Sequence, residues 1–400
     1  MHASRVLVVG GSLGGLTAAC LLRDSGYDVK ICERSPSQLE QRGAGIGLLE
    51  ATHRYLTDRV GVNLDSISVA TSEIVYLSRD DAVQHRSTHM YRFSSWNTVY
   101  RQLLDAFGTD RYLLDRHVVA VLNEDDCVAV TFADGSREQA DIVVAADGIR
   151  STVRAQHLPD VEPVYSGYVA WRGTVPESLL AAGVRERLGD AITYHVFANS
   201  HILVYPIPSL DGSIGAGERL LNFVWYRNYL PAGDLEDLMT SCDGQLRDVS
   251  VPPGLVASHH VDELRATAAA RLPATLSAVV QAVEEPFVQV VYDIAVPAMR
   301  FGRVCLIGDA AFAVRPHAAA GTAKAAEDAW MLDRHLGRHE DVDAALRAWE
   351  SDQLTLGRNL LDRTRRVGQR SQVENSWTPG DADLIFGLHE PGDGRPAGDA

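Results

Sequence analysis

The sequence predicts an α/β protein with one nucleotide-binding fold and a second region rich in short strands. Apolar runs of strand length occur at residues 6–9, 142–146 and 304–307, and a helical pattern follows each of them. Residues 164–291 instead carry several short strands and few long helical patterns. At 400 residues the chain is long enough to bury more than one core.

The clearest local signal lies at the N-terminus. The strand at residues 6–9 leads through a glycine-rich turn into a helix, and residues 28–32 resume a strand. Gly10 opens the turn, where a dinucleotide pyrophosphate would meet the helix N-terminus. Glu33 follows 23 residues later, in position to bind a ribose. Because Ser12 occupies the second glycine position, a simple tight turn is the alternative.

Two later strands also end in an acidic residue beside a glycine. Asp147 and Gly148 follow the strand at 142–146, and Gly308 and Asp309 follow the strand at 304–307. A carboxylate at a strand's carboxyl end suits sugar-like hydroxyl groups. Each pair taken alone is also typical of an ordinary turn.

Composition narrows the classes of partner. The 37 basic and 53 acidic residues give a net charge of −16, which disfavours nucleic acid and anionic membranes as partners. Five scattered cysteines without a CxxC pair indicate reduced thiols in a cytoplasmic protein. No apolar run approaches the about 18 residues of a membrane span, and no signal peptide is recognisable.

Three further segments have sequence features that could suggest a function, and we interpret each of them structurally. Gly212–Gly217 precedes a β-type run, so we interpret it as a hairpin loop and expect a single dinucleotide fold. Residues 371–400 have the composition of a mobile tail, although Phe386 and Leu388 could dock on the body. His259 and His260 lack a third ligand at helical or hairpin spacing, so we expect no metal.

The glycines near residue 10, Asp147-Gly148 and Gly308-Asp309, in this order, resemble the FAD-dependent aromatic hydroxylases, the single-component flavoprotein monooxygenases. Within that family the chain resembles most the branch of 2,6-dihydroxypyridine hydroxylases and natural-product pyridinol hydroxylases. The resemblance runs from about residue 6 to residue 370. Its weaker, branch-level segments are 168–173, 201–208 and 315–321.

The resemblance implies a Rossmann-like FAD-binding domain with an inserted β-sheet substrate domain and a C-terminal helical segment. We expect residues 1–70, 97–163 and 292–370 to form the FAD-binding domain, including a helical stretch from about 323 to 370. Residues 71–96 and 164–291 would form the substrate-binding sheet over the flavin, and residues 371–400 the tail.

The family's cofactor contacts carry over residue by residue. Ser12, Leu13 and Gly14 would hold the pyrophosphate, Glu33 and Arg34 the adenosine end, and Asp309 the ribityl chain. Asp147 would serve both FAD and the docking of NAD(P)H. The implied cofactor-binding set is Gly10, Ser12, Leu13, Gly14, Glu33, Arg34, Arg42, Arg101, Asp147, Asp309, Pro316, Gly321 and Thr322. The chain departs from the family at Phe312, where many members have His, and at Ala323, where Asn is usual.

The implied activity is a monooxygenase that consumes NAD(P)H and O2. By this resemblance FAD forms a C4a hydroperoxide, which hydroxylates an electron-rich ring such as a hydroxypyridine or phenol. A homodimer or higher homo-oligomer is expected. A flavoprotein oxidase, dehydrogenase or halogenase on the same fold is the alternative, although no Trp-x-Trp-x-Ile-Pro halogenase signature is present. A non-catalytic flavin-binding protein is a further alternative.

Substrate contacts are expected on the strands over the flavin. His201 and Tyr205 share one strand face, and His317 would lie beside the flavin, so these three are the catalytic candidates. The candidate substrate-binding set is Tyr194, His201, Tyr205, Trp225 and Pro316. Ordinary sheet packing is the alternative for the strand residues, and a backbone-bonded helix start is the alternative for His317.

The kind of ring follows from the charges on these strands. Residues 192–197 and 201–205 contain no arginine or lysine, so we expect a neutral hydroxypyridine rather than a benzoate. Arg172, Arg219 or Arg227 would overturn this expectation by pointing into the pocket.

Overall fold

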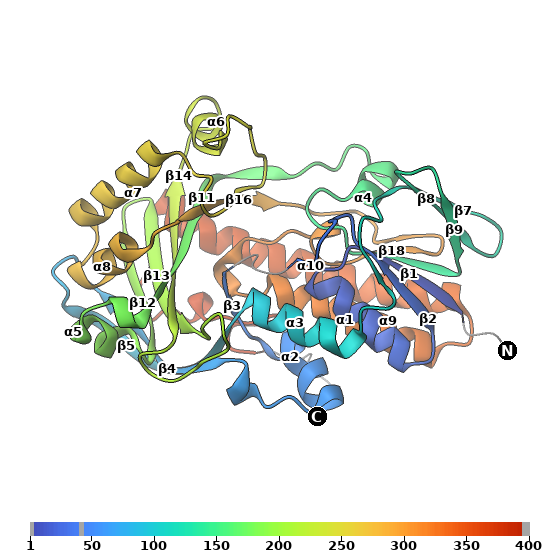
Figure 1. The fold of residues 1–400 in the computed structure, drawn as a ribbon, viewed down its shortest axis with the longest axis horizontal. Helices are drawn as coiled ribbons and strands as arrows, with labels where there is room; N and C mark the ends of the chain where they lie inside the picture. Colours follow the sequence, from blue (N-terminus) through green and yellow to red (C-terminus); the bar gives the residue numbers. More distant parts are fainter. Residues whose placement is uncertain (1–3, 40–43, 394–400) are drawn as a thin grey trace.

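The structure, a computed structural model, describes residues 4–39 and 44–393. Two large sheets form the framework: Figure 1 shows the six-stranded sheet with α1, α3 and α9 on one side of the molecule and the nine-stranded sheet with α7 and α8 on the other. Among the described residues, no helix is both long enough and apolar enough to cross a membrane.

The six-stranded sheet has the strand order β17-β18-β10-β1-β2-β6, and only β17 runs antiparallel to its neighbour. The strands β1, β10 and β18 are almost entirely buried, which explains why they appear in the sequence as short continuous apolar runs. The strands are β1 (Arg5–Val9), β2 (Asp28–Cys32), β6 (Tyr112–Leu113), β10 (Ile142–Ala145), β17 (Arg300–Phe301) and β18 (Val304–Leu306).

The nine-stranded sheet has the order β15-β16-β11-β14-β13-β12-β4-β5-β3 and is antiparallel except where β12 pairs with β4. Its strands are β3 (Gly45–Gly47), β4 (Val69–Leu77), β5 (Val83–Ser95), β11 (Val164–Pro176), β12 (Ala191–Phe197), β13 (Ser200–Ile207), β14 (Leu220–Asn228), β15 (Ser250–Val251) and β16 (Phe287–Asp293). The turn at 212–217 joins the antiparallel strands β13 and β14, as expected for a hairpin loop.

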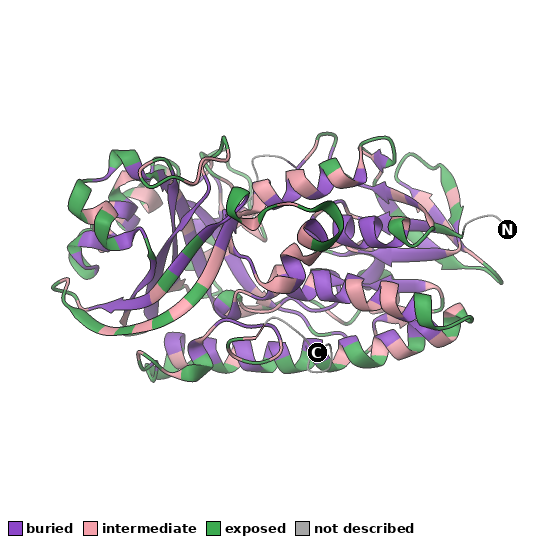
Figure 2. Ribbon diagram, turned by 90° about the horizontal axis from the view of Figure 1, so that it is seen from below, coloured by how far each residue is buried: buried purple, intermediate pink, exposed green. Residues whose placement is uncertain are grey.

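The remaining elements cover these sheets. A three-stranded sheet holds β7 (Val118–Asn123), β8 (Val128–Phe132) and β9 (Arg137–Ala140). The helices are α1 (Leu13–Asp24), α2 (Glu50–Tyr55), α3 (Trp96–Phe107), α4 (Thr152–His157), α5 (Ala182–Leu188), α6 (Asp234–Met239), α7 (Ser258–Arg271), α8 (Ala274–Ala282), α9 (Gly321–Arg338) and α10 (Val342–Gln369). Figure 2 shows that most strands of the two large sheets are buried, whereas exposed residues lie on helices, on loops and along the strand β5.

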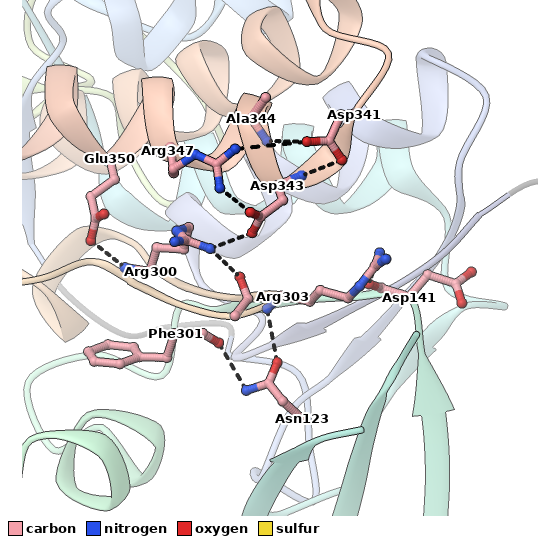
Figure 3. A network of polar contacts seen from close by, with 11 residues as sticks. Asn123, Asp141, Arg300, Phe301, Arg303, Asp341, Asp343, Ala344, Arg347 and Glu350 are labelled. Atoms are coloured by element: carbon pink, nitrogen blue, oxygen red, sulfur yellow. Dashed lines mark hydrogen bonds and ion pairs between the residues drawn. The ribbon is translucent and has the colours of Figure 1, made fainter. Parts of the chain in front are cut away.

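The helical stretch expected from 323 to 370 is divided into α9 and α10. The Asp341 side chain caps α10 by accepting hydrogen bonds from the backbone amides of Asp343 and Ala344. Figure 3 shows how this end of α10 is tied to β17: Arg300 lies 2.6 Å from Asp343, and the backbone amide of Arg300 donates to Glu350 at 2.9 Å. Asn123 joins the same strand pair to β7.

The segment after α10 packs on the body as far as residue 393. Trp377, Leu384, Phe386 and Leu388 are all buried, and the backbone amide of Phe386 donates to the Tyr91 hydroxyl at 3.0 Å. The expectation of a mobile tail is therefore wrong for residues 371–393, because their apolar side chains are covered by the nine-stranded sheet and α10. The alternative, docking of Phe386 and Leu388, is the arrangement observed.

Candidate functional site

A cavity of about 440 Å³ lies where the carboxyl ends of β1, β10 and β18 meet one face of the nine-stranded sheet. Ligands of open α/β sheets bind at this edge of the strands. The six-stranded side contributes Ser12, Leu13, Gly14, Gly148, Asp309, Pro316, Gly321 and Thr322. The nine-stranded side contributes Gly45, Phe93, Arg172, Leu203, Tyr205, Val224, Tyr226 and Gln289.

The turn at Gly10 brings the N-terminus of α1 to the cavity. Gly10 has φ +98°, and a Cβ there would lie 2.5 Å from the carbonyl oxygen of Ala146. A Cβ at Gly15 would lie 2.0 Å from the carbonyl oxygen of Gly10. Only glycine fits both positions, so the helix start approaches the strand end closely enough for its free amides to meet an anion.

Glu33 connects this turn to the end of β2. Its Oε2 accepts a hydrogen bond from the Gly11 amide at 2.9 Å, and its Oε1 accepts one from the Ser35 amide at 2.8 Å. Each carboxylate oxygen retains a second lone pair for a ribose hydroxyl. Arg34 beside it is exposed, and Arg101 lies half-buried on α3. Arg42 lies outside the described residues.

Asp147 and Asp309 stand at the ends of neighbouring strands, as their motifs predict. Asp147 Oδ2 accepts from the Val153 amide at 3.2 Å, while its shielded Oδ1 has no partner among the described residues. Asp309 opens onto the cavity. Desolvation by the surrounding protein raises the pKa of both carboxyl groups above its ordinary value. The Oδ1 of Asp147 therefore lacks a partner that a hydroxyl donor of a ligand would supply, and Asp309 presents its carboxylate to the cavity.

A buried ion pair lies close enough to Asp309 to influence the pKa of its carboxyl group. Lys324 Nζ lies 2.7 Å from Asp328 Oδ2, and this carboxylate also accepts from the Gly308 amide at 2.7 Å. The Lys324 charge opposes the rise in the pKa of Asp309. The sequence marks Lys324 only as a departure beside Ala323, and the helical spacing to Asp328 is the signal that could have revealed the pair.

Strand alternation decides which side chains of the nine-stranded sheet face the cavity. Tyr205 and Tyr226 line it, and Tyr205 donates from its hydroxyl to the Gly45 carbonyl at 2.9 Å. The Tyr205 ring also stacks on Phe93 with centroids 4.1 Å apart. Phe93 and Phe386 complete this aromatic wall, and sequence reasoning missed both as site residues because they arrive from β5 and the C-terminal segment.

Three of the candidate substrate-binding residues do not reach the cavity wall. Trp225 neighbours Tyr226 in the strand and therefore points to the opposite face, where it packs in the core under α7 and α8. Tyr194 has the right face but stacks on Tyr76 with centroids 5.0 Å apart. His201 lies beyond Leu203 on its strand and packs against Trp377.

His317 also lies behind the wall, at the seam between the two sheets. Its Nε2 pairs with the Tyr168 hydroxyl at 2.7 Å, its Nδ1 is buried without a partner in the described chain, and its ring centroid is 4.8 Å from that of Tyr226. Burial lowers the pKa of His317 to about 3 and lowers that of His201 well below its ordinary value. Both imidazoles are therefore neutral at physiological pH.

The three arginines that could have placed a positive charge in the pocket lie in different surroundings. Arg219 pairs with buried Glu177, and Arg227 pairs with Glu263 at 2.8 Å. Arg172 instead lines the cavity from β11. The expectation of a pocket without a fixed cation is therefore wrong, because the charge comes from a strand outside residues 192–205.

The histidine pair at 259–260 has a neighbour that the sequence did not reveal. Asp237 on α6 brings Oδ2 within 3.7 Å of His259 Nε2 and 3.3 Å of His260 Nε2. Asp237 is too far from the pair in the sequence for helical or hairpin spacing to reveal it, and two of the three side chains are exposed.

Fold and cavity define a flavin-binding protein of the aromatic hydroxylase class, and comparison with known proteins gives the same result. Residues 3–168 and 262–364 match the family described as FAD binding domain, and residues 165–293 match one described as FAD binding domain-like. The chain belongs to the FAD binding domain family and is an FAD-dependent monooxygenase within it.

Individual members of the family are similar to this chain over almost its whole length. The 2,6-dihydroxypyridine 3-monooxygenase of Paenarthrobacter nicotinovorans is 38% identical over 96% of both chains. The 6-hydroxynicotinate 3-monooxygenase of Bordetella bronchiseptica is 28% identical over 96% of this chain and 94% of its own. The solved structure of 2,6-dihydroxypyridine-3-hydroxylase from Arthrobacter nicotinovorans superposes with a TM-score of 0.92 at 36% identity, covering 97% of this chain and 98% of that one.

Proposed function

We propose that this monooxygenase hydroxylates a ring carbon of a hydroxypyridine, with NAD(P)H as electron donor. The observation that carries the proposal is the shared cavity, where the strand ends typical of FAD binding face an aromatic wall. The names of the most similar relatives support a hydroxypyridine over other electron-rich rings. Bound FAD would supply electron transfer from NAD(P)H to O2 and transfer of one oxygen atom to the ring.

The residues on the six-stranded side fit FAD. The free amides at the start of α1, beside Ser12, Leu13 and Gly14, would bind the pyrophosphate, and the unpartnered Oδ1 of Asp147 would accept a hydroxyl. Asp309 would hold ribityl hydroxyls. The other proposed cofactor contacts are Gly10, Glu33, Arg34, Arg42, Arg101, Pro316, Gly321 and Thr322.

The nine-stranded side would position the ring and exclude water from it. Tyr205, Tyr226 and Pro316 all line the cavity, and we expect a flat ring to pack against them. His201 and His317 act as positioning residues behind Tyr226, because neither touches the cavity. Tyr194 and Trp225 support the sheet.

The test measures NAD(P)H oxidation by the purified holoenzyme with and without 2,6-dihydroxypyridine, and the product by mass spectrometry. We expect faster oxidation with the ring present and a product heavier by one oxygen atom taken from labelled O2. Hydrogen peroxide as the sole product would instead indicate an oxidase. Asp309→Asn should weaken FAD retention, measured by heat extraction, while the circular dichroism of the protein stays unchanged.

Four expectations stay predictions that simple measurements can check. A homodimer or higher oligomer would appear in light scattering, a cytoplasmic location in cell fractionation, and the domain boundaries in limited proteolysis. A substrate that accelerates flavin reduction by NAD(P)H would show up in stopped-flow absorbance.

A further inference from the structure

Arg172 is a cationic side chain in the cavity wall that faces no carboxylate among the described residues. Its Nη1 donates to Gln289 Oε1 at 2.9 Å, and its Nη2 donates to the carbonyl oxygen of Gly45. Its Nε is buried and has no partner in the described part of the chain. Other arginines of this region are paired: Arg315 lies 2.8 Å from Asp293, and Arg219 lies 2.9 Å from Glu177.

The groups around Arg172 do not neutralise its charge. Tyr205 on β13 and Tyr226 on β14 are its titratable neighbours, and burial raises the pKa of each phenol, so both stay protonated at neutral pH. Gln289 on β16 and Gly45 on β3 offer only neutral acceptors. Among the described residues that line the cavity, the one carboxylate is Asp309, on the other sheet.

Arg172 is half-buried, and its Nε is buried without a partner among the described residues. A partly desolvated guanidinium without a counter-ion is costly, and an anionic ligand oxygen would reduce that cost. Tyr205 and Arg172 both donate to the Gly45 carbonyl, so their polar groups converge on one point of the wall. The planar fork of arginine suits a ring oxygen or a carboxylate. Neither His201 nor His317 lines the cavity, so neither imidazole reaches this point of the wall.

We propose that Arg172 determines substrate specificity by binding an anionic oxygen carried by the aromatic ring, either an ionised ring hydroxyl or a ring carboxylate. The inference rests on the proposed function, because it names the charge state of that substrate. It replaces the neutral ring expected from the strand composition alone.

The experiment titrates the FAD-loaded enzyme with ring ligands and follows the change in flavin absorbance. The probes are 2,6-dihydroxypyridine over a series of pH values, 2,6-dimethoxypyridine, which cannot ionise at oxygen, and 6-hydroxynicotinate, which adds a carboxylate. The variants are Arg172→Gln, which removes the charge, and Arg172→Lys, which keeps the charge without the fork. Arg227→Gln is the matched control, because Arg227 pairs with Glu263 outside the cavity.

For the wild type we expect affinity for 2,6-dihydroxypyridine to rise with pH until the ring hydroxyl is ionised, and little binding of the dimethoxy compound. Arg172→Gln should raise the Kd of the ionised ligand by at least about tenfold and flatten its pH dependence, as loss of a charge-assisted hydrogen bond requires. Arg172→Lys should keep the pH dependence at intermediate affinity, and Arg227→Gln should match the wild type. A loss confined to 6-hydroxynicotinate would identify the carboxylate as the anion.

Wild-type affinity of Arg172→Gln for every anionic probe would overturn the inference. So would loss of FAD from this variant with unchanged ligand affinity in the molecules that retain FAD, because Arg172 would then serve the cofactor. Failure of the proposed function is separate: the wild type would turn over no hydroxypyridine. In that case 4-hydroxybenzoate is the probe, and Arg172→Gln must still weaken its binding for the inference to stand.

Discussion

The six-stranded and nine-stranded sheets contribute to the same cavity in different ways. The parallel sheet uses the ends of its strands, where the helix start after Gly10, Gly148 beside Asp147, and the Asp309 carboxylate meet the cavity. The antiparallel sheet uses one face, along which Arg172, Tyr205 and Tyr226 point the same way from three strands.

The difference shows why one half of the site is local in sequence and the other is not. A strand end and its following turn lie within a few residues of each other, so their chemistry forms a motif. One face of a sheet is made of every second residue of each strand, and the strands can be far apart in the sequence. Two neighbouring residues of a strand therefore lie on opposite faces, one toward the cavity and the other toward the core. Trp225 and Tyr226 differ by one position and lie on opposite faces.

The largest expected effect tests the strand-end half. Gly10→Ala should destabilise the protein by at least about 3 kcal/mol and abolish FAD retention, because it combines positive φ with overlap of the Ala146 carbonyl. Gly26→Ala is the matched control: its φ is +94° but no atom lies within 4 Å of the added Cβ, so about 1 kcal/mol is expected. Denaturant unfolding and FAD content measure both. Equal losses would show that close approach to Ala146 is unimportant.

The next largest effect is expected at His317, which lies between the two sheets. His317 has its pKa lowered to about 3, below the unfolded value, so protonation favours the unfolded chain and stability is lost as pH falls below about 6.5. Between pH 7 and 4.5 the protonation of this one histidine should lower the free energy of unfolding by about 2.5 kcal/mol. His317→Gln should remove that share of the acid sensitivity, measured as unfolding free energy against pH. Parallel pH curves for variant and wild type would show that His317 titrates normally.

A smaller effect tests the alternation within the nine-stranded sheet. Trp225→Phe should lower stability by about 1 to 3 kcal/mol with unchanged ligand affinity, because the ring packs in the core and its Nε1 donates to Ser200 Oγ at 2.9 Å. Tyr226→Phe should change stability little but alter ligand affinity and coupling of NAD(P)H oxidation to product. Thermal unfolding and flavin titration separate the two. The reverse pattern would place Trp225 at the cavity.

The smallest effect concerns the polar network far from the site (Figure 3). Asp343 is half exposed and bridges Arg300 and Arg347. Asp343→Asn should cost less than about 1 kcal/mol, since exposed ion pairs contribute little, and salt should reduce the difference further. Denaturant midpoints at low and high salt measure it. A change in FAD content or substrate affinity would mean that this edge is coupled to the cavity.

The sequence alone determined the half of the site whose parts are contiguous. The glycine turn, Asp147 and Asp309 each follow a short apolar strand, and parallel strands bring such ends together at one edge. For the same reason the family resemblance and the FAD fold followed from these motifs.

Only the tertiary structure decided the other half. It placed Arg172 in the cavity wall, removed Trp225 and Tyr194 from it, and brought Phe386 in from the end of the chain. Residue type and alternation say that a side chain faces one side of a sheet, but not which strands flank it or what covers that side. The partners of a charge lie on other strands, so whether Arg172 meets a carboxylate or a ligand is settled by packing alone.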